Sequence, residues 1–339
     1  MKRSLVFLSL LVIALLVVSL VVSCTPKPKE TVILRLVVPA PPGDMLTVKD
    51  EELAARFNER AGGEYEIKVY PGEQLVKMPE YLDAVRTGAV EIMDAGWGIF
   101  GGLDPRLGVH ETPFLYNNIR AGAASQEALV ELFAPMFQEK FNQKPLASFT
   151  TGAMELIGNK PVKTLEDWKG TLVGAINPPI AGMVVQMGGS PVTIMWTDMY
   201  TNLEKGVIDA GLISNQGTLQ LGIYDVITQN TTFYGPTGQN AYNINLDVWN
   251  AMPQRIQDIL LEETRQTAAT MNETFIRLFD EDIESLREKG VDVYVLPNAE
   301  RERWKETCQP LIEQNLAAAG EFGQQVKQIC DEANSQFPN

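Results

Sequence analysis

The first third of the chain alternates between short β-type stretches and amphipathic helical stretches. Residues 31–39, 65–70 and 90–95 are rich in β-branched and other apolar side chains, as strands of a half-buried sheet are. Between them, residues 49–61 and 78–87 carry apolar side chains at helical spacing, and glycine follows each segment. The order strand, helix, strand, helix, strand predicts an α/β sheet with crossover helices.

Two loops of this first part are candidate walls of a binding site. Open α/β sheets bind ligands outside the carboxyl ends of their strands. Residues 41–45 and 96–100 follow predicted strands at those ends, and both contain glycine. Plain turn geometry also explains these glycines, and the two explanations are compatible.

The second half of the chain repeats the pattern. Its apolar runs and turn residues predict strands at 146–150, 154–157, 171–175 and 207–213, and helices at 165–168 and 199–205. A further helix is predicted after Asn-Pro-Pro at 177–179 and runs to residue 187.

A long amphipathic segment follows at residues 253–289. Its apolar side chains recur at helical spacing over 37 residues, which corresponds to roughly 55 Å of unbroken helix. Pro253 suits a first-turn position and Gly290 a stop. We expect a single rod that crosses two lobes; two helices with a kink near residues 264–270 are the alternative.

The N-terminal segment has the form of a secretory leader. An apolar run at residues 4–24 follows two basic residues and ends in Val-Val-Ser-Cys, which resembles the lipobox of bacterial lipoproteins. We therefore expect residues 1–23 to be a signal peptide, Cys24 to carry a lipid anchor, and residues 24–30 to tether an extracytoplasmic protein to the membrane. An uncleaved membrane anchor is the alternative, because the run is nearly long enough to span a bilayer.

Charge and reactive side chains exclude several classes of function. The chain has 43 acidic and 28 basic residues, a net charge of −15, whereas nucleic-acid binding needs clustered Lys and Arg. We expect no nucleic-acid partner. The single histidine, His110, lies in no metal-type spacing, and we expect no metal and no cofactor. Cys308 and Cys330 are either a disulfide or two buried free thiols.

Seven segments together resemble one protein family. They are VYPGEQL at 69–75, LDAVRTGAVE at 82–91, TPFLY at 112–116, NKPVKTLEDWKG at 159–170, GGSPV at 188–192, YTNLEKGVID at 200–209 and VWNAMP at 248–253. Each is weak alone. Their order and spacing are similar to those of the periplasmic solute-binding subunits of tripartite ATP-independent (TRAP) transporters, of the dicarboxylate-binding (DctP) type. The resemblance covers nearly the whole chain after the tether.

The resemblance implies an α/β, two-lobed periplasmic-binding-protein fold with a long helix spanning both lobes. It implies that lobe I comprises residues 31–151 and 238–280, and lobe II residues 152–237 and 281–339. Proteins of this family close around one small organic solute and pass it to integral-membrane TRAP permease subunits, driven by an ion gradient. The implied protein is not an enzyme.

The chain departs from the family at the positions that usually bind a carboxylate. Gly174 falls where the family has an arginine on a strand, and Met154 falls where it has a second one. Ile213 stands in the segment that replaces the family's Glu-Asn-Pro, and Met45 is a further apolar residue where charge is expected. An arginine fork is the natural partner of a carboxylate, and these four positions lack it.

Two tryptophans add large rings to the same set. Trp97 follows a predicted strand, and Trp196 lies in a loop before a predicted helix. Both are candidate ligand contacts, and the alternative for each is a place in the core of a lobe.

These departures favour a neutral, apolar or aromatic solute over a dicarboxylate, because an unpaired buried carboxylate is costly. Two alternatives stay open. A carboxylate could bind another group, such as the helix N-terminus near Asn177 or a displaced Arg or Lys. A cationic solute could stack on tryptophan, helped by Asp44 or Asp198.

Two other functions compete with transport. A binding lipoprotein that serves a sensor or another receptor would have the same fold and pocket, and neighbouring genes for two membrane subunits would distinguish transport from it. An enzyme would need carboxylates alone, such as Glu155 with Asp198, because the sequence has no Gly-x-Ser-x-Gly elbow and no Cys/His pair near a pocket.

Overall fold

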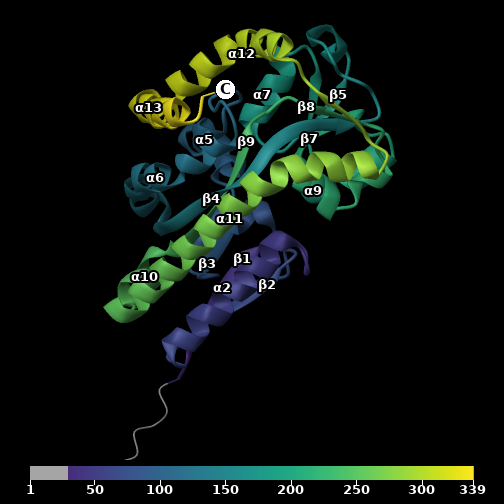
Figure 1. Ribbon diagram of the computed structural model, residues 1–339. Helices are drawn as coiled ribbons and strands as arrows, with labels where there is room; N and C mark the ends of the chain where they lie inside the picture. Colours follow the sequence, from purple (N-terminus) through teal and green to yellow (C-terminus); the bar gives the residue numbers. More distant parts are fainter. Residues whose placement is uncertain (1–29, 339) are drawn as a thin grey trace, which may run out of the picture.

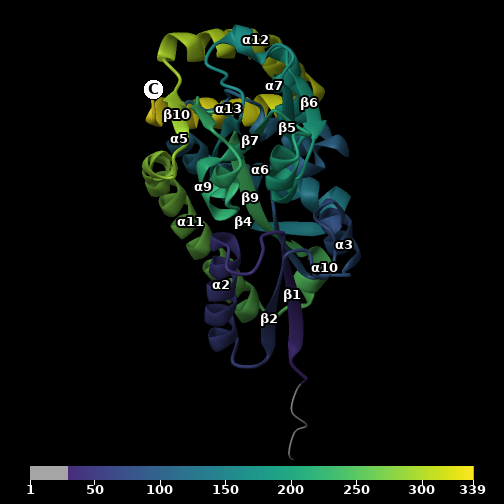
Figure 2. The same ribbon diagram turned by 90° about the vertical axis from the view of Figure 1, so that its right-hand side faces the viewer.

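The computed structural model describes residues 30–338. The predicted signal peptide, Cys24 and the tether up to residue 29 therefore lie outside the described residues. Ten strands form two sheets joined through a shared strand, with helices on both faces (Figures 1 and 2). The strands are β1 (Val32–Val38), β2 (Tyr65–Pro71), β3 (Ile92–Ala95), β4 (Gln143–Gly158), β5 (Leu172–Ala175), β6 (Ser190–Thr193), β7 (Ala210–Ser214), β8 (Gln229–Thr232), β9 (Thr237–Asn245) and β10 (Asp292–Val295).

The helices that cover these sheets belong mainly to crossover connections and to the C-terminal third. The α-helices are α2 (Met45–Ala61), α3 (Tyr81–Thr87), α4 (Pro105–Gly108), α5 (Ile119–Ala124), α6 (Gln126–Phe141), α7 (Pro178–Gln186), α8 (Met199–Glu204), α9 (Asn215–Gln220), α10 (Leu246–Ala251), α11 (Gln254–Glu288), α12 (Asn298–Ala318) and α13 (Gly320–Gln336). Short 3₁₀ turns include η2 (Trp97–Gly102) and η5 (Trp196–Asp198).

Lobe I is built on the sheet β2-β1-β3-β9-β4. Its first three strands are parallel, as the alternating strand and helix pattern of the sequence predicts, and β9 then runs antiparallel to both β3 and β4. Helix α2 connects β1 to β2 and ends at Gly62, whose φ of 63° is the left-handed conformation that suits a helix end.

Lobe II is built on the far end of β4 with β7, β5 and β6, and with β8 and β10 on the other side of β4. Strands β5, β6 and β7 are parallel to one another, while β4 is antiparallel to β7 and β8. Both figures show β1 and β2 toward one end of the molecule and β5 toward the other, and Figure 2 shows β6 beside β5. The predicted two-lobed α/β fold is confirmed; the sequence boundaries of the lobes stay a prediction.

Strand β4 joins the two lobes. The pattern predicted two strands, at 146–150 and 154–157, and the structure has one strand of 16 residues with a register shift between Thr150 and Ala153. Gly152 lies in this shift with φ of 96°, a conformation open to glycine at low cost. Side chains alternate across β4: Phe149 packs in the core beneath α2 and α11, and Met154 in the core of the opposite face.

Helix α11 is the longest element and contacts both lobes. It runs unbroken over 35 residues, so the single rod is confirmed and the kinked pair is not observed. It packs on α2 and β4 in lobe I, and on α9 and β10 in lobe II (Figure 1). Its buried face carries apolar side chains at helical spacing, which explains why the sequence pattern located it: Ile256, Leu260, Met271, Phe275, Phe279, Ile283 and Leu286.

Strand β9 lies entirely in the interior although its sequence, TGQNAYNIN, is mostly polar. Its side-chain amides satisfy buried partners across the core. Asn243 accepts from Trp97 Nε1 at 2.9 Å, and Asn245 donates to the Val85 carbonyl at 2.8 Å. Hydrophobic periodicity does not detect a polar strand of this kind, and the sequence pattern therefore does not predict β9.

The two C-terminal helices close the fold, with α12 against α7 and α13 against α5 and α6. Their cysteines, Cys308 and Cys330, are buried and free, so the disulfide alternative is excluded. Among the helices of residues 30–338, none combines the length and the apolar character that a membrane span requires.

Candidate functional site

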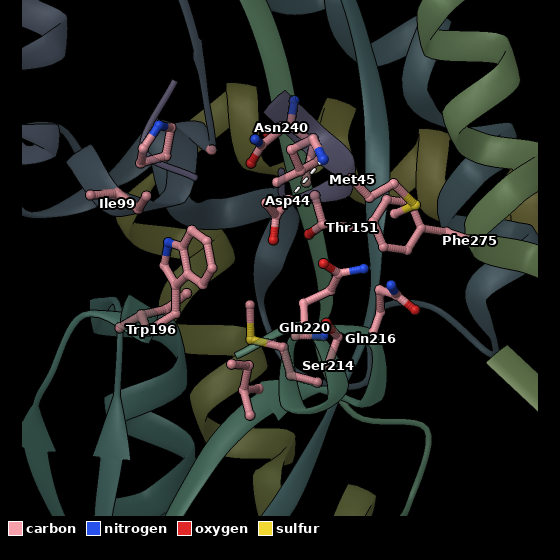
Figure 3. A pocket seen from close by; sticks show the side chains of 18 of the residues that line it. Asp44, Met45, Ile99, Thr151, Trp196, Ser214, Gln216, Gln220, Asn240 and Phe275 are labelled. Atoms are coloured by element: carbon pink, nitrogen blue, oxygen red, sulfur yellow. Dashed lines mark hydrogen bonds between the residues drawn. The ribbon is translucent and has the colours of Figure 1, made fainter. Parts of the chain in front are cut away.

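A cavity that is partly open to solvent lies between the two lobes, and its empty space amounts to about 840 Å³ when the open solvent at its mouth is included. Figure 3 shows side chains of lobe I and of lobe II facing each other across it, with Phe275 of α11 at one side. Its lining residues are Pro39, Asp44, Met45, Leu46, Met78, Gly96, Ile99, Glu111, Thr151, Met154, Ile176, Trp196, Leu212, Ile213, Ser214, Gln216, Gly217, Gln220, Gln239, Asn240 and Phe275.

The carboxyl ends of parallel strands supply much of this lining, as the sheet architecture requires. In lobe I, Asp44 follows β1 and begins α2, where its Oδ1 accepts a hydrogen bond from the Leu46 N–H at 2.8 Å. In lobe II, Ser214 ends β7 and begins α9, where its Oγ accepts from the Gly217 N–H at 3.1 Å. Each cap fixes the backbone at the cavity edge. Both loops expected to form walls, 41–45 and 96–100, contribute lining residues.

The lobe II side and the middle of the cavity are mostly apolar. Met154 of β4, Ile213 of β7 and Phe275 of α11 are buried, and Trp196 is half-buried in η5. In Figure 3 the Trp196 ring lies across the cavity from Asp44 and Asn240. Gln216 and Gln220 of α9 supply amides on this side. A ring or another apolar group fits such a surface.

The lobe I side is polar and acidic. We call Asp44, Gly96, Glu111, Gln239 and Asn240 the lobe I wall. All four of its polar residues are at most 8% exposed. Burial raises the pKa of Asp44 above its ordinary value, and it raises the pKa of Glu111 to about 8. The wall therefore holds its carboxyl groups with a reduced tendency to ionise.

A second layer of carboxyl groups lies behind this wall. Asp94 of β3 is fully buried, and its Oδ1 accepts from Asn240 Nδ2 at 2.9 Å. Asp50 of α2, also fully buried, accepts from the Tyr242 hydroxyl at 2.7 Å. Burial raises the pKa of both carboxyl groups, and the charge of Asp94 raises that of Asp50 further. This layer orients Asn240 and brings no positive charge to the cavity.

Glu111 is held from the side away from the cavity. It lies in the short 3₁₀ turn after α4, and its Oε2 accepts from Asn177 Nδ2 at 2.5 Å. Its neighbour His110 is buried, which lowers the pKa of His110 to about 4 and keeps the ring neutral. Asn177 itself begins α7, where its Oδ1 accepts from the Ile180 N–H at 3.0 Å.

The structure brings four of the seven predicted contact residues to the cavity. Met45, Met154, Trp196 and Ile213 line it. Asn177 does not line the cavity. It donates a hydrogen bond to Glu111, which does. Contact of these residues with a solute stays a prediction.

Trp97 and Gly174 lie elsewhere, which corrects their expected location. Trp97 is fully buried in the lobe I core, where it stacks on Phe133 with ring centroids 4.5 Å apart. The core alternative for Trp97 is therefore the observed one. Gly174 lies in β5, and a Cβ there would be 3.0 Å from Met199 and Ile208 side chains in the interior of lobe II.

The sequence pattern missed most of the polar lining. Gln239 and Asn240 come from the unpredicted strand β9, and Gln216 and Gln220 from the short helix α9. Glu111 gave no signal beyond its place before the TPFLY segment. The one available sign was a run of amide side chains in a stretch without glycine or proline, at 239–245.

Comparison with known families and relatives gives a consistent result. Residues 38–318 match the model of the bacterial extracellular solute-binding protein family 7, DctP. The chain is 25% identical over 272 residues to the C4-dicarboxylate-binding protein DctB of Bacillus subtilis, covering 78% of this chain and 76% of that protein.

Solved structures show the same fold. DctP7, a Bordetella pertussis extracytoplasmic solute receptor that binds pyroglutamic acid, has a TM-score of 0.81 at 22% identity, covering 88% of this chain and 99% of that one. A TRAP periplasmic solute-binding protein of Desulfovibrio salexigens with bound orotic acid has a TM-score of 0.79 at 22% identity, covering 90% and 99%. The ligands of these similar proteins differ.

Proposed function

Because this chain belongs to the bacterial extracellular solute-binding protein family 7, we propose that it captures a small, neutral, apolar or aromatic solute and delivers it to a TRAP permease in the membrane. It works outside the cytoplasm, held to the membrane by a lipid on Cys24. The family is one of solute receptors and not of enzymes.

One observation carries the choice of solute. Among the cavity-lining residues of the described chain, none is Arg, Lys or His, whereas two are carboxylic acids, Asp44 and Glu111. A carboxylate bound here would lose its hydration without gaining a cationic partner, which costs several kcal/mol or more. The Asp44 and Glu111 carboxyl groups supply no positive charge either. A dicarboxylate is therefore the least favourable class of solute.

The shape and chemistry of the opposite side support the same choice. Trp196, Phe275, Met45, Met154 and Ile213 offer rings and apolar surface. Burial of a solute ring against them is favourable in proportion to the apolar area removed from water. The amides of the cavity supply orientation without charge.

A thermal-shift screen of the full-length protein in mild detergent tests this proposal. The panel contains dicarboxylates, keto acids, sugar acids, aromatic acids, neutral aromatic compounds and quaternary amines. A ligand at 100 times its dissociation constant adds about 2.7 kcal/mol of stability. We expect shifts with neutral or aromatic compounds. A strong shift with a simple dicarboxylate would show that another cation reaches the site.

A further inference from the structure

Two fully buried carboxyl groups meet behind the lobe I wall. Asp94 of β3 lies opposite Tyr242 of β9 in the sheet, so both side chains leave the same face. Asn240 precedes Tyr242 by two residues on β9 and shares this face. Helix α2 brings Asp50 to the same place, where it accepts from the Tyr242 hydroxyl at 2.7 Å. The fold thus brings two acids from separate elements together, and both are 0% exposed.

One oxygen of each carboxyl group has a partner, and the other has none. Asp50 Oδ1 accepts from Tyr242, and Asp94 Oδ1 accepts from Asn240 Nδ2 at 2.9 Å. Within residues 30–338, Asp50 Oδ2 and Asp94 Oδ2 have no donor, although the two side chains lie within hydrogen-bonding reach of each other. Two ionised carboxylates cannot form a hydrogen bond, because each only accepts. A proton on one of them supplies the missing donor and satisfies both groups.

The surroundings disfavour a second negative charge. The charged and titratable groups that act on the two acids or on Tyr242 are Asp44, Glu51 and Arg56 of α2, Tyr81 of α3 and Tyr242 itself. Arg56 is the one cation of this set, and it forms a salt bridge with Glu263 of α11 at 2.7 Å. Burial raises the pKa of Asp94 to about 7. Burial and the charge of Asp94 raise the pKa of Asp50 well above its ordinary value.

We propose that Asp50 and Asp94 share a single proton near and above neutral pH, and that this protonated pair positions Asn240 in the lobe I wall. The proton lies on Asp50 and is donated to ionised Asp94, which also accepts from Asn240. Loss of the proton leaves two adjacent charges in the interior, and their repulsion loosens the contact of α2 with β3 and β9. The inference deepens the proposed function, because Asn240 lines the solute cavity.

Infrared spectroscopy of the full-length protein in mild detergent detects the proton directly. Carbon-13 in the aspartate carboxyl groups separates their bands from those of glutamate. At about pH 8, aspartates with ordinary pKa values are ionised, so a remaining carboxylic-acid band reports a retained proton. We expect this band in the parent protein and its loss in Asp50→Asn. A parent protein without the band, or a variant that keeps it in full, would overturn the inference.

Asp50→Asn also replaces a titrating donor by a permanent one. Its amide oxygen accepts from Tyr242, and its NH₂ donates to Asp94 at any pH. Hydrogen exchange of residues 92–95 and 237–245, followed by mass spectrometry and corrected for the intrinsic rate, measures how firmly the wall is held. Between about pH 7 and about pH 10, protection should fall roughly tenfold or more in the parent protein and stay nearly constant in the variant.

The matched control is Asp282→Asn. Asp282 of α11 is also buried, with a pKa raised to about 7, but its carboxyl oxygens lie 3.0 Å from the side-chain amide of Gln216 rather than beside a second acid. It should change neither the band at about pH 8 nor the exchange of β3 and β9.

If Asp50→Asn does not fold, Asp94→Asn is an independent variant, because its amide can accept from Asn240 and donate to Asp50. An equal alkaline loss of protection in the parent protein and in the folded variant would overturn the inference. No solute enters these measurements, so their failure is distinct from a failure of the ligand screen.

Discussion

Glu111 and Glu155 are both buried glutamates, and burial raises the pKa of each to about 8, yet their surroundings differ. Glu155 lies on β4, and its Oε2 accepts from the Phe233 N–H at 2.6 Å. Arg301 of α12 lies near it and donates to the carbonyl oxygen of the same Phe233 at 2.9 Å. Glu111 has Asn177 on one side and the cavity on the other.

The difference distinguishes a buried carboxyl group that stabilises the fold from one that borders the cavity. Around Glu155, groups of the protein itself bind the segment that links β8 to β9, with Arg301 also donating to the Asn117 and Tyr234 carbonyls at 3.0 and 3.3 Å. Around Glu111, the Asn177 amide holds one side of the carboxyl group, and the residue also borders the cavity. A buried polar group takes its hydrogen bonds from the protein or from a bound partner, and of these two glutamates only Glu111 is placed to meet a solute.

The largest effect is expected from Trp97→Ala, because this ring lies in the lobe I core. The substitution leaves a large cavity next to Phe133 and removes the Nε1 hydrogen bond to Asn243. We expect a loss of about 3–5 kcal/mol in the free energy of unfolding, measured by urea denaturation. An unfolding free energy within 1 kcal/mol of the parent protein, about the size of a typical mutational effect, would place Trp97 outside the core.

Arg301→Met tests the structural side of the comparison. It removes the donor to three backbone carbonyls and leaves Glu155 without its nearby cation. We expect a loss of about 3 kcal/mol in unfolding free energy and an unchanged solute ranking. Altered ligand preference in a folded variant would mean that this region belongs to the binding site.

Trp196→Ala tests the cavity side. The ring is half-buried and lines the cavity, so its removal should cost roughly tenfold or more in solute affinity with little change in melting temperature. Affinity can be measured by calorimetry with whichever probe binds best. Full retention of affinity would remove Trp196 from the set of contacts.

The two glutamates also predict how stability depends on pH. Their folded pKa of about 8 lies above the ordinary value, so the folded state binds more protons than the unfolded state between the two values. Stability should fall as pH rises toward 8. His110, whose pKa is lowered to about 4, acts in the opposite sense only below about 6.5. Urea midpoints between pH 6.5 and 8 should therefore decrease, and less steeply in Glu155→Gln; parallel slopes would contradict the assignment.

The smallest effect concerns the two buried cysteines. Cys308 and Cys330 are free, and burial raises the pKa of each to about 12. Their thiols should react slowly with a disulfide reagent in the native protein and quickly in urea. Reductant should leave the melting temperature unchanged. A drop in melting temperature on reduction would indicate a bond between them.

The sequence predicted well where one face of an element is apolar. The periodicity of α11 reflects a single buried face, and the apolar and β-branched side chains of β1 and β2 indicate strands, so their positions followed from the pattern. Strand β9 is buried on both faces and polar, because its amides bind partners distant in the sequence, such as Asp94. Contacts of that kind leave no local pattern.

The candidate site was predictable only in part, because several of its residues are brought together by the fold and not by a local sequence pattern. Met154 and Ile213 were located by position relative to family motifs, and they line the cavity. Trp97 was not placed correctly, because a residue just after a strand can point to the core or to the cavity, and its neighbours Phe133 and Phe137 come from the unpredicted helix α6. Glu111 and Asn240 become a pair only through the fold.

The most direct measurement of the central claim is the ligand screen on the full-length protein in mild detergent. The account predicts a clear rise in melting temperature with neutral or aromatic compounds, and none with C4-dicarboxylates or sugar acids. A strong rise with a dicarboxylate would contradict it, because the described cavity lining offers a carboxylate no cation.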